Sequence, residues 1–104
     1  MGQGSRTKPV HLSQKLLEIR SALQLSQNEL IYHLGLSNEL TQARVSAYER
    51  GVREPTLIVL LAYARAANVT VEALIDDEIN LPEKLPARTK SEGIKRRRAF
   101  RAKS

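Results

Sequence analysis

The feature that most constrains how this chain can fold is a helix of only about two turns. Residues that start a helix precede it, and a residue that ends a helix follows it. Ser26-Gln27-Asn28-Glu29 has the pattern of a capping box, in which the Ser26 hydroxyl accepts from the third helical amide and Glu29 accepts from the Ser26 amide. Gly35 suits the left-handed conformation that closes a helix. Because so short a helix is not stable alone, neighbouring helices must pack against it.

Similar patterns predict a helix on each side of this one. The first carries leucine and isoleucine at helical spacing and ends near Gln24-Leu25. Its inward residues are Leu12, Leu16, Ile19 and Leu23. Thr41 can cap the other helix, predicted at about Gln42 to Glu49, with Val45 and Tyr48 inward and Gly51 after its end.

We expect a fourth helix at the centre of the core, because it is the most apolar segment of the chain. Pro55-Thr56 marks its start and Asn68 its end. The residues assigned to its core face are Leu57, Ile58, Leu60, Leu61, Ala64 and Ala67. Thr70 can cap a short fifth helix with Leu74 and Ile75 inward. No strand-like alternation occurs, so the prediction is an all-α fold.

The distribution of charge divides the chain. The formal net charge is +6, but residues 83–104 hold nine Lys and Arg against two Glu, whereas residues 1–82 are close to neutral. We therefore predict a flexible N-terminal arm at 1–10, a folded domain at 11–80 and a basic, largely disordered tail at 81–104. The basic tail indicates a polyanionic partner.

Several classes of protein are disfavoured by the composition. There is no cysteine, and His11 and His33 are too far apart in sequence to indicate a metal site; His33 is expected at the surface. The chain has neither clustered histidines and carboxylates nor a glycine-rich phosphate loop, the features that would indicate an enzyme. We therefore expect no catalytic residue and no cofactor. No apolar run reaches the roughly 20 residues that span a bilayer, so we expect a cytoplasmic, nucleoid-associated protein without membrane contact.

An ordered set of short segments carries a family resemblance. They are Leu25-Ser26-Gln27-Asn28-Glu29-Leu30, Leu34-Gly35, the run Gln42 to Gly51 that ends in Tyr48-Glu49-Arg50-Gly51, and Pro55-Thr56-Leu57. Together they strongly resemble the Xre-type, phage lambda repressor/Cro-like helix-turn-helix DNA-binding family, from about Lys15 to Ile75. The resemblance implies a five-helix lambda-repressor-like domain whose second helix crosses the phosphate backbone and whose third enters the major groove.

The resemblance also implies roles for individual residues. It places Gln27 at a phosphate, Gln42, Ala43 and Ala47 towards the bases, and Arg53 near the backbone. Glutamine can pair bidentately with adenine, and an alanine methyl can contact thymine. Arg44 reaches guanine or a phosphate, or is an ordinary surface charge. The predicted DNA-binding set is Gln27, Thr41, Gln42, Ala43, Arg44, Ser46, Ala47 and Arg53.

Two further features follow from the resemblance. Members of the family often pair an arginine of the first helix with the glutamate that ends the third, and Arg20 and Glu49 match these positions, which implies a structural ion pair. The chain departs from the family within residues 36–40, where it carries about four residues more than the usual short turn. This insertion puts the angle between the second and third helices in doubt, and Glu39 within it would be repelled by phosphate.

The function expected from these features is that of a sequence-specific, double-stranded DNA-binding transcriptional regulator, a repressor, acting as a homodimer. In this interpretation the tail neutralises phosphates without choosing a sequence. The alternative is a protein-interaction module of the antitoxin type, whose tail binds a partner protein while the domain binds DNA for autoregulation. Ile94 and Phe100 would then be the anchors of the tail, and the partner would need an acidic patch.

Overall fold

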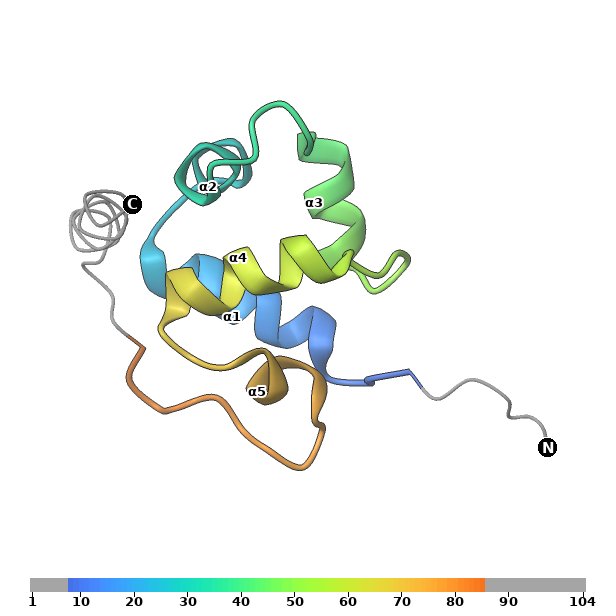
Figure 1. Ribbon diagram of the computed structural model, residues 1–104, viewed down its shortest axis with the longest axis vertical. Helices are drawn as coiled ribbons and strands as arrows, with labels where there is room; N and C mark the ends of the chain where they lie inside the picture. The colour runs from blue at the N-terminus through green and yellow to red at the C-terminus, as the bar shows by residue number, and fades with distance from the viewer. Residues whose placement is uncertain (1–7, 86–104) are drawn as a thin grey trace, which may run out of the picture.

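Five α-helices make up the regular structure of residues 8–85, the part of the chain that the computed structural model describes (Figure 1). They are α1 (Leu12–Leu23), α2 (Gln27–Leu34), α3 (Gln42–Glu49), α4 (Leu57–Ala67) and α5 (Val71–Ile75). No strand occurs within residues 8–85, which confirms the predicted all-α fold of five helices. Residues 1–7 of the predicted arm and residues 86–104 of the predicted tail lie outside the described residues.

The helix boundaries follow the capping residues that the sequence indicated. The capping box is present, because the Ser26 amide donates to Glu29 at 2.9 Å and the Glu29 amide donates to the Ser26 hydroxyl at 3.1 Å. Thr41, Thr56 and Thr70 each accept a backbone amide at the start of α3, α4 and α5. Gly35 closes α2 with a φ of 74°. Local sequence therefore sets where these helices begin and end.

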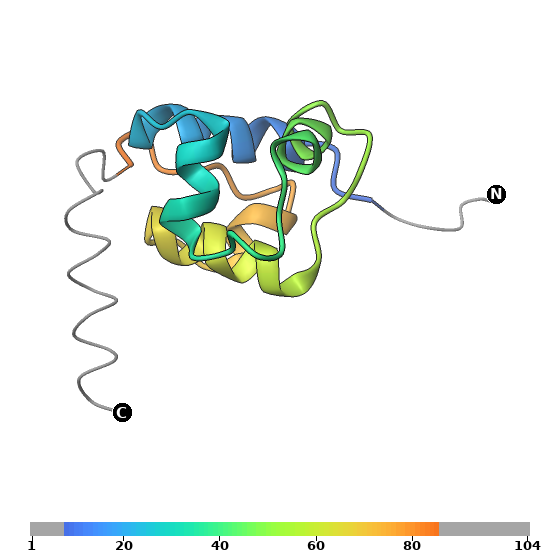
Figure 2. The same cartoon turned by 90° about the horizontal axis from the view of Figure 1, so that it is seen from above.

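The core forms where α1 meets three other helices. α1 packs against α3, α4 and α5, and α2 packs against α3 and α4. Figure 2 shows α1 and α4 along opposite sides of the body. Leu16 and Ile19 of α1 are fully buried, as are Val45 of α3 and Leu74 of α5. Burial of each such side chain stabilises the folded state by about 1.5–3 kcal/mol. Because α1 packs against α3 through these side chains, α1 is the scaffold that holds α3 in place.

The predicted core face of α4 is partly wrong. Leu57, Ile58 and Leu61 are 77%, 63% and 36% exposed, whereas Val59 and Tyr63, which the prediction left out, are buried. The first two turns of α4 carry apolar residues around their whole circumference, so periodicity does not select one face there. The prediction that Ile75 points inward is also wrong, because α5 leaves this side chain 43% exposed. The first turn of α4 therefore presents large apolar side chains to solvent.

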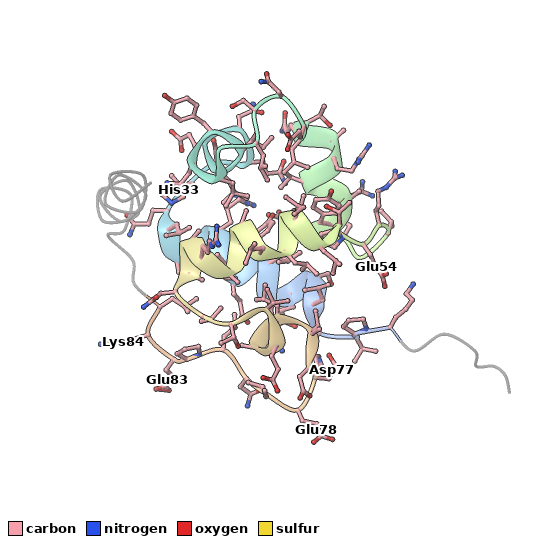
Figure 3. The ribbon with its side chains drawn as sticks, in the orientation of Figure 1. His33, Glu54, Asp77, Glu78, Glu83 and Lys84 are labelled. Atoms are coloured by element: carbon pink, nitrogen blue, oxygen red, sulfur yellow. The ribbon has the colours of Figure 1, made fainter. Side chains whose placement is uncertain are left out.

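His33 is a second correction. It was expected at the surface, but it is buried on α2, one helical turn after Leu30 (Figure 3). α2 is short and packs against both α3 and α4, so little of its circumference remains in water. His33 therefore belongs to the packed side of α2 and is not a surface group.

Lys15 is a buried cation inside the apolar face of α1. Its side chain is 5% exposed, and its Nζ donates to three backbone carbonyl oxygens: Ala73 at 2.8 Å, Asp76 at 3.0 Å and Ile79 at 2.8 Å. An ammonium group has three donors, and all three are used here. Lys15 therefore ties the end of α5 and the segment that follows it to α1.

Asp77 ties the same segment to the residues before α1. Its two carboxylate oxygens accept from the amides of Val10 at 3.0 Å and His11 at 3.1 Å (Figure 3). The hydrogen bond from the Val10 amide is the largest cause that lowers the pKa of Asp77, and the bond from the His11 amide adds to it.

In the Asp77→Asn variant, the thermal stability of the fold is expected to fall less on acidification than it does in the wild type. A carboxylate whose pKa is lower in the folded than in the unfolded chain stabilises the fold above the unfolded value of about 3.9, and this contribution disappears as the pH falls through the folded pKa. Thermal unfolding from about pH 6 to about pH 2 measures the difference between wild type and variant. Glu83→Gln, in the same segment, is the control. A difference that does not change with pH would contradict the role of Asp77.

Candidate nucleic-acid interface

α3 divides its side chains between the core and an open face. Val45 and Tyr48 are buried, as predicted, and hold the helix against the body. On the open side, Gln42, Ala43 and Arg44 are exposed. Ser46 and Ala47 are half-buried, so they lie at the edge between the two faces. In Figure 1, α3 stands beside α2 at one side of the molecule, joined to it by the loop from 35 to 41.

Arg20 of α1 and Glu49 of α3 form a bidentate ion pair. Arg20 Nε lies 2.7 Å from Glu49 Oε2, and Arg20 Nη2 donates to Glu49 Oε1 at 3.0 Å. The guanidinium also donates to the Leu25 carbonyl at 3.0 Å. The hydrogen bond with Glu49 raises the pKa of Arg20, and only 6% of the Glu49 side chain is exposed. The ion pair joins the last turn of α3 to α1. The bond to the Leu25 carbonyl joins Arg20 to the turn that precedes α2.

A chain of amide groups extends this ion pair to the start of α3. Gln27 Nε2 donates to Glu49 Oε1 at 3.0 Å, and Gln42 Nε2 donates to Gln27 Oε1 at 3.2 Å. Gln27 and Gln42 are each the first residue of their helix, directly after the capping Ser26 and Thr41. The order Arg20, Glu49, Gln27, Gln42 therefore runs from the core to the exposed tip of α3.

Gln27 and Gln42, at the exposed end of this series of hydrogen bonds, keep unused donor and acceptor groups. A side-chain amide has two N–H donors and one oxygen acceptor. Gln42 uses one donor on Gln27, which leaves its oxygen and its second N–H free to pair with another group. Gln27 likewise keeps one N–H. Gln42 thus retains the donor and acceptor pair that recognition of adenine requires.

Polar and basic side chains flank this tip. The Thr41 hydroxyl accepts the Arg44 amide at 3.2 Å and keeps its own proton for another acceptor. Arg50 Nε donates to the Ser46 hydroxyl at 3.2 Å, along the last turn of α3. Arg53 is exposed in the loop between α3 and α4. The predicted DNA-binding residues therefore lie on α3, at the start of α2 and in the loop that follows α3.

The connector between α2 and α3 is anchored at both ends. The amides of Glu39 and Leu40 both donate to the Leu36 carbonyl at 2.9 Å, which forms a turn. Leu36 and Leu40 are buried, whereas Ser37, Asn38 and Glu39 are exposed. Residues 36–40 therefore form a turn fastened to the core by two leucines, and Thr41, the N-cap of α3, directly follows the second of them.

The sequence analysis missed one feature of this site and one of the fold that supports it. It named Gln27 and Gln42 but did not foresee that they bond to each other. The pattern that indicated this contact is the glutamine that directly follows the cap of two successive helices. It also missed Lys15, although Lys15 lies between Leu12 and Ile19 at spacings of three and four, on the apolar face.

No three His, Asp or Glu side chains within residues 8–85 gather closely enough to hold a metal ion. Among the same residues, no helix has the length and apolar character needed to cross a membrane.

Comparison with known proteins finds a matching family model and a similar protein. A family model described as "Helix-turn-helix" matches residues 16–74. The chain is also 39% identical over 64 residues to the uncharacterized HTH-type transcriptional regulator y4dL of Sinorhizobium fredii (strain NBRC 101917 / NGR234). That match covers 62% of this chain and 31% of the other protein, so the chain spans about a third of the length of this relative. No solved structure matches the chain.

Proposed function

The chain belongs to the helix-turn-helix family of the Xre and lambda Cro-like type, and from this premise we propose that it is a sequence-specific, double-stranded DNA-binding transcriptional regulator. In the proposed complex α3 enters the major groove and α2 lies across the phosphate backbone. The observation that carries this proposal is the Gln42 side chain, exposed at the tip of α3 and held by Gln27, with a donor and an acceptor still free.

Base reading is assigned to the exposed side of α3. Gln42 would accept from adenine N6 and donate to adenine N7 through the atoms that Gln27 leaves free. Ala43 and Ala47 have no bulk beyond a methyl group, which lets the helix approach the bases and offers contact to a thymine methyl. Arg44, at the same exposed tip, would reach guanine or a phosphate.

Phosphate contacts are assigned to groups around the reading helix. The second amide proton of Gln27 lies at the start of α2, where free backbone N–H groups and the helix dipole favour an anion. The free hydroxyl proton of Thr41 and the exposed guanidinium of Arg53 would donate to the DNA backbone on either side of α3. Ser46 lies between these two residues in the sequence, on α3. These contacts orient the domain on DNA but carry no sequence information.

The regulator is proposed to act as a homodimer that represses transcription in the cytoplasm, associated with the nucleoid. One reading helix covers only a few base pairs, so two copies related by a two-fold axis would read a pseudo-palindromic site. Half-sites about 10 base pairs apart, one helical turn of DNA, would place both reading helices on the same face of the duplex. Selection from random duplex DNA tests binding, symmetry and spacing together.

Gln42→Ala is expected to relax the preference at one position of each half-site by about 1–3 kcal/mol, because the free donor and acceptor are both lost. Selection from random duplexes, followed by measured affinities for single-base variants of the site, gives this value. Gln14→Ala makes the same change on the exposed face of α1, where Gln14 donates to Glu18 at 3.2 Å, and is expected to leave the preference unchanged. Identical site preferences for wild type and Gln42→Ala would show that another residue reads the base.

Removing residues 88–104 is expected to reduce the salt dependence of DNA binding. This segment contains eight Lys and Arg and one Glu, and each phosphate that it neutralises contributes about 0.9 to the slope of log affinity against log salt. Affinities of the full and shortened chains at several salt concentrations give the two slopes. An unchanged slope would mean that the tail does not contact DNA and would favour the alternative function, in which the tail binds a partner protein.

A further inference from the structure

A groove of about 750 Å³ lies between the start of α1, the start of α4 and α5, and no part of the proposed DNA interface lines its apolar floor. Leu12 and Leu60 form the buried floor. Leu57 and Ile75 also line it but are 77% and 43% exposed, so they present apolar surface to water. Exposed apolar surface gathered in a concave site is typical of a binding surface.

The rim of this groove is acidic. Glu54, Glu72 and the run Asp76 to Glu78 line it, against one basic residue, Lys8. The Asp77 carboxylate is bonded to the amides before α1, and Asp76 Oδ1 accepts the Glu78 amide. Within residues 8–85, however, the Glu54 and Glu72 carboxylates have no hydrogen bond or ion pair. Figure 3 shows Asp77 and Glu78 across α4 from α2 and the upper part of α3. The groove therefore fits an apolar side chain flanked by cations, and its charge repels DNA.

The C-terminal segment of the same chain has this composition. Ile94 and Phe100 are its two large apolar residues, and six cations stand from Lys95 to Lys103. The described residues end at Leu85, which packs against the core, so fifteen residues separate it from Phe100. At about 3.3 Å per residue these could span roughly 50 Å, more than the roughly 30 Å diameter of a small domain.

We propose that residues 94–101 dock in this groove of the same molecule, with the Phe100 ring between Leu57 and Ile75 and the flanking arginines beside Glu54 and Glu72. Burial of the ring supplies the apolar contribution, and the opposite charges fix which segment is accepted. Docking would hold the cations of the tail away from α3, and the higher charge density of DNA phosphates would compete for them. The inference does not depend on the proposed function, because docking is measured without DNA.

A single fluorophore in the full chain tests this docking. The chain contains no Trp, so the Phe100→Trp variant reports only on the tail. Its emission is expected to be blue-shifted and protected from acrylamide quenching, equally at low and high protein concentration. Adding Leu57→Lys, which places a cation on the exposed groove wall, should shift the emission to that of a solvated tryptophan and abolish the protection. High salt should do the same, because it screens the charges.

The neighbouring position on α4 supplies a matched control. Ile58 is 63% exposed but does not line the groove, so Ile58→Lys should leave the emission and the protection unchanged. Circular dichroism confirms that each variant is folded. The proposal is overturned by a solvated emission in the Phe100→Trp variant, by protection that survives Leu57→Lys, or by protection that increases with protein concentration, which would place the tail on a second copy.

Discussion

Replacing Arg20 by methionine is expected to lower the free energy of unfolding by about 3–5 kcal/mol. The Glu49 carboxylate would remain buried, 6% exposed, and the Gln27 amide would be its one remaining side-chain donor within residues 8–85. An uncompensated charge in such a site costs much more than the loss of an exposed ion pair. Methionine keeps an apolar stem, so the change removes charge rather than packing. Denaturant unfolding followed by circular dichroism measures the loss.

A double variant, Arg20→Met with Glu49→Met, separates stability from DNA recognition. Replacing both charges of a buried pair by apolar groups is often neutral, so most of the lost stability should return. The Gln27 amide would still lose the Glu49 oxygen and would hold Gln42 less firmly. We therefore expect a folded protein that binds its selected site more weakly than wild type. A single Arg20→Met variant that loses less than about 1 kcal/mol would contradict a buried pair.

Lys15→Met is expected to lower the free energy of unfolding by about 3 kcal/mol. It removes the Lys15 donor from the Ala73 and Ile79 carbonyl oxygens, whereas the Asp76 oxygen still accepts the Ile79 amide, and each buried unsatisfied group costs about 1–3 kcal/mol. The Ala73 oxygen is buried, whereas the bonds to Asp76 and Ile79 are partly exposed, so water compensates part of the loss. The end of α5 would also loosen from α1.

Hydrogen exchange distinguishes this local role from a general loss of stability. The amides of Asp76 and Ile79, bonded to the carbonyls of Glu72 and Asp76, should exchange faster in Lys15→Met than their counterparts in α2. Lys84→Met, which removes an exposed lysine, should change neither exchange nor stability. A uniform increase in exchange across the domain would argue against a specific tie between α1 and α5.

The start and end of each helix could be predicted because they depend on neighbouring residues. Ser26 and Glu29 satisfy each other's amides within one turn, and Gly35 closes α2 without a Cβ penalty. The proposed DNA-binding residues on α3 come from their positions in the family pattern. Arg20 and Glu49 were paired in the same way, and their side chains meet at 2.7 Å. Local sequence and family pattern thus identified the helices and the residues of the candidate site.

Which face of each helix is buried depended on the other helices. Leu57 and Ile58 have the pattern of core residues, yet within residues 8–85 both are exposed, whereas His33 is enclosed because α3 and α4 both pack against α2. Lys15 is buried because three carbonyls from distant residues meet its Nζ. The sequence by itself determined the helices and their caps through contacts a few residues apart. Only the tertiary structure decided burial and the link from Gln27 to Gln42, because these require groups far apart in the chain to meet.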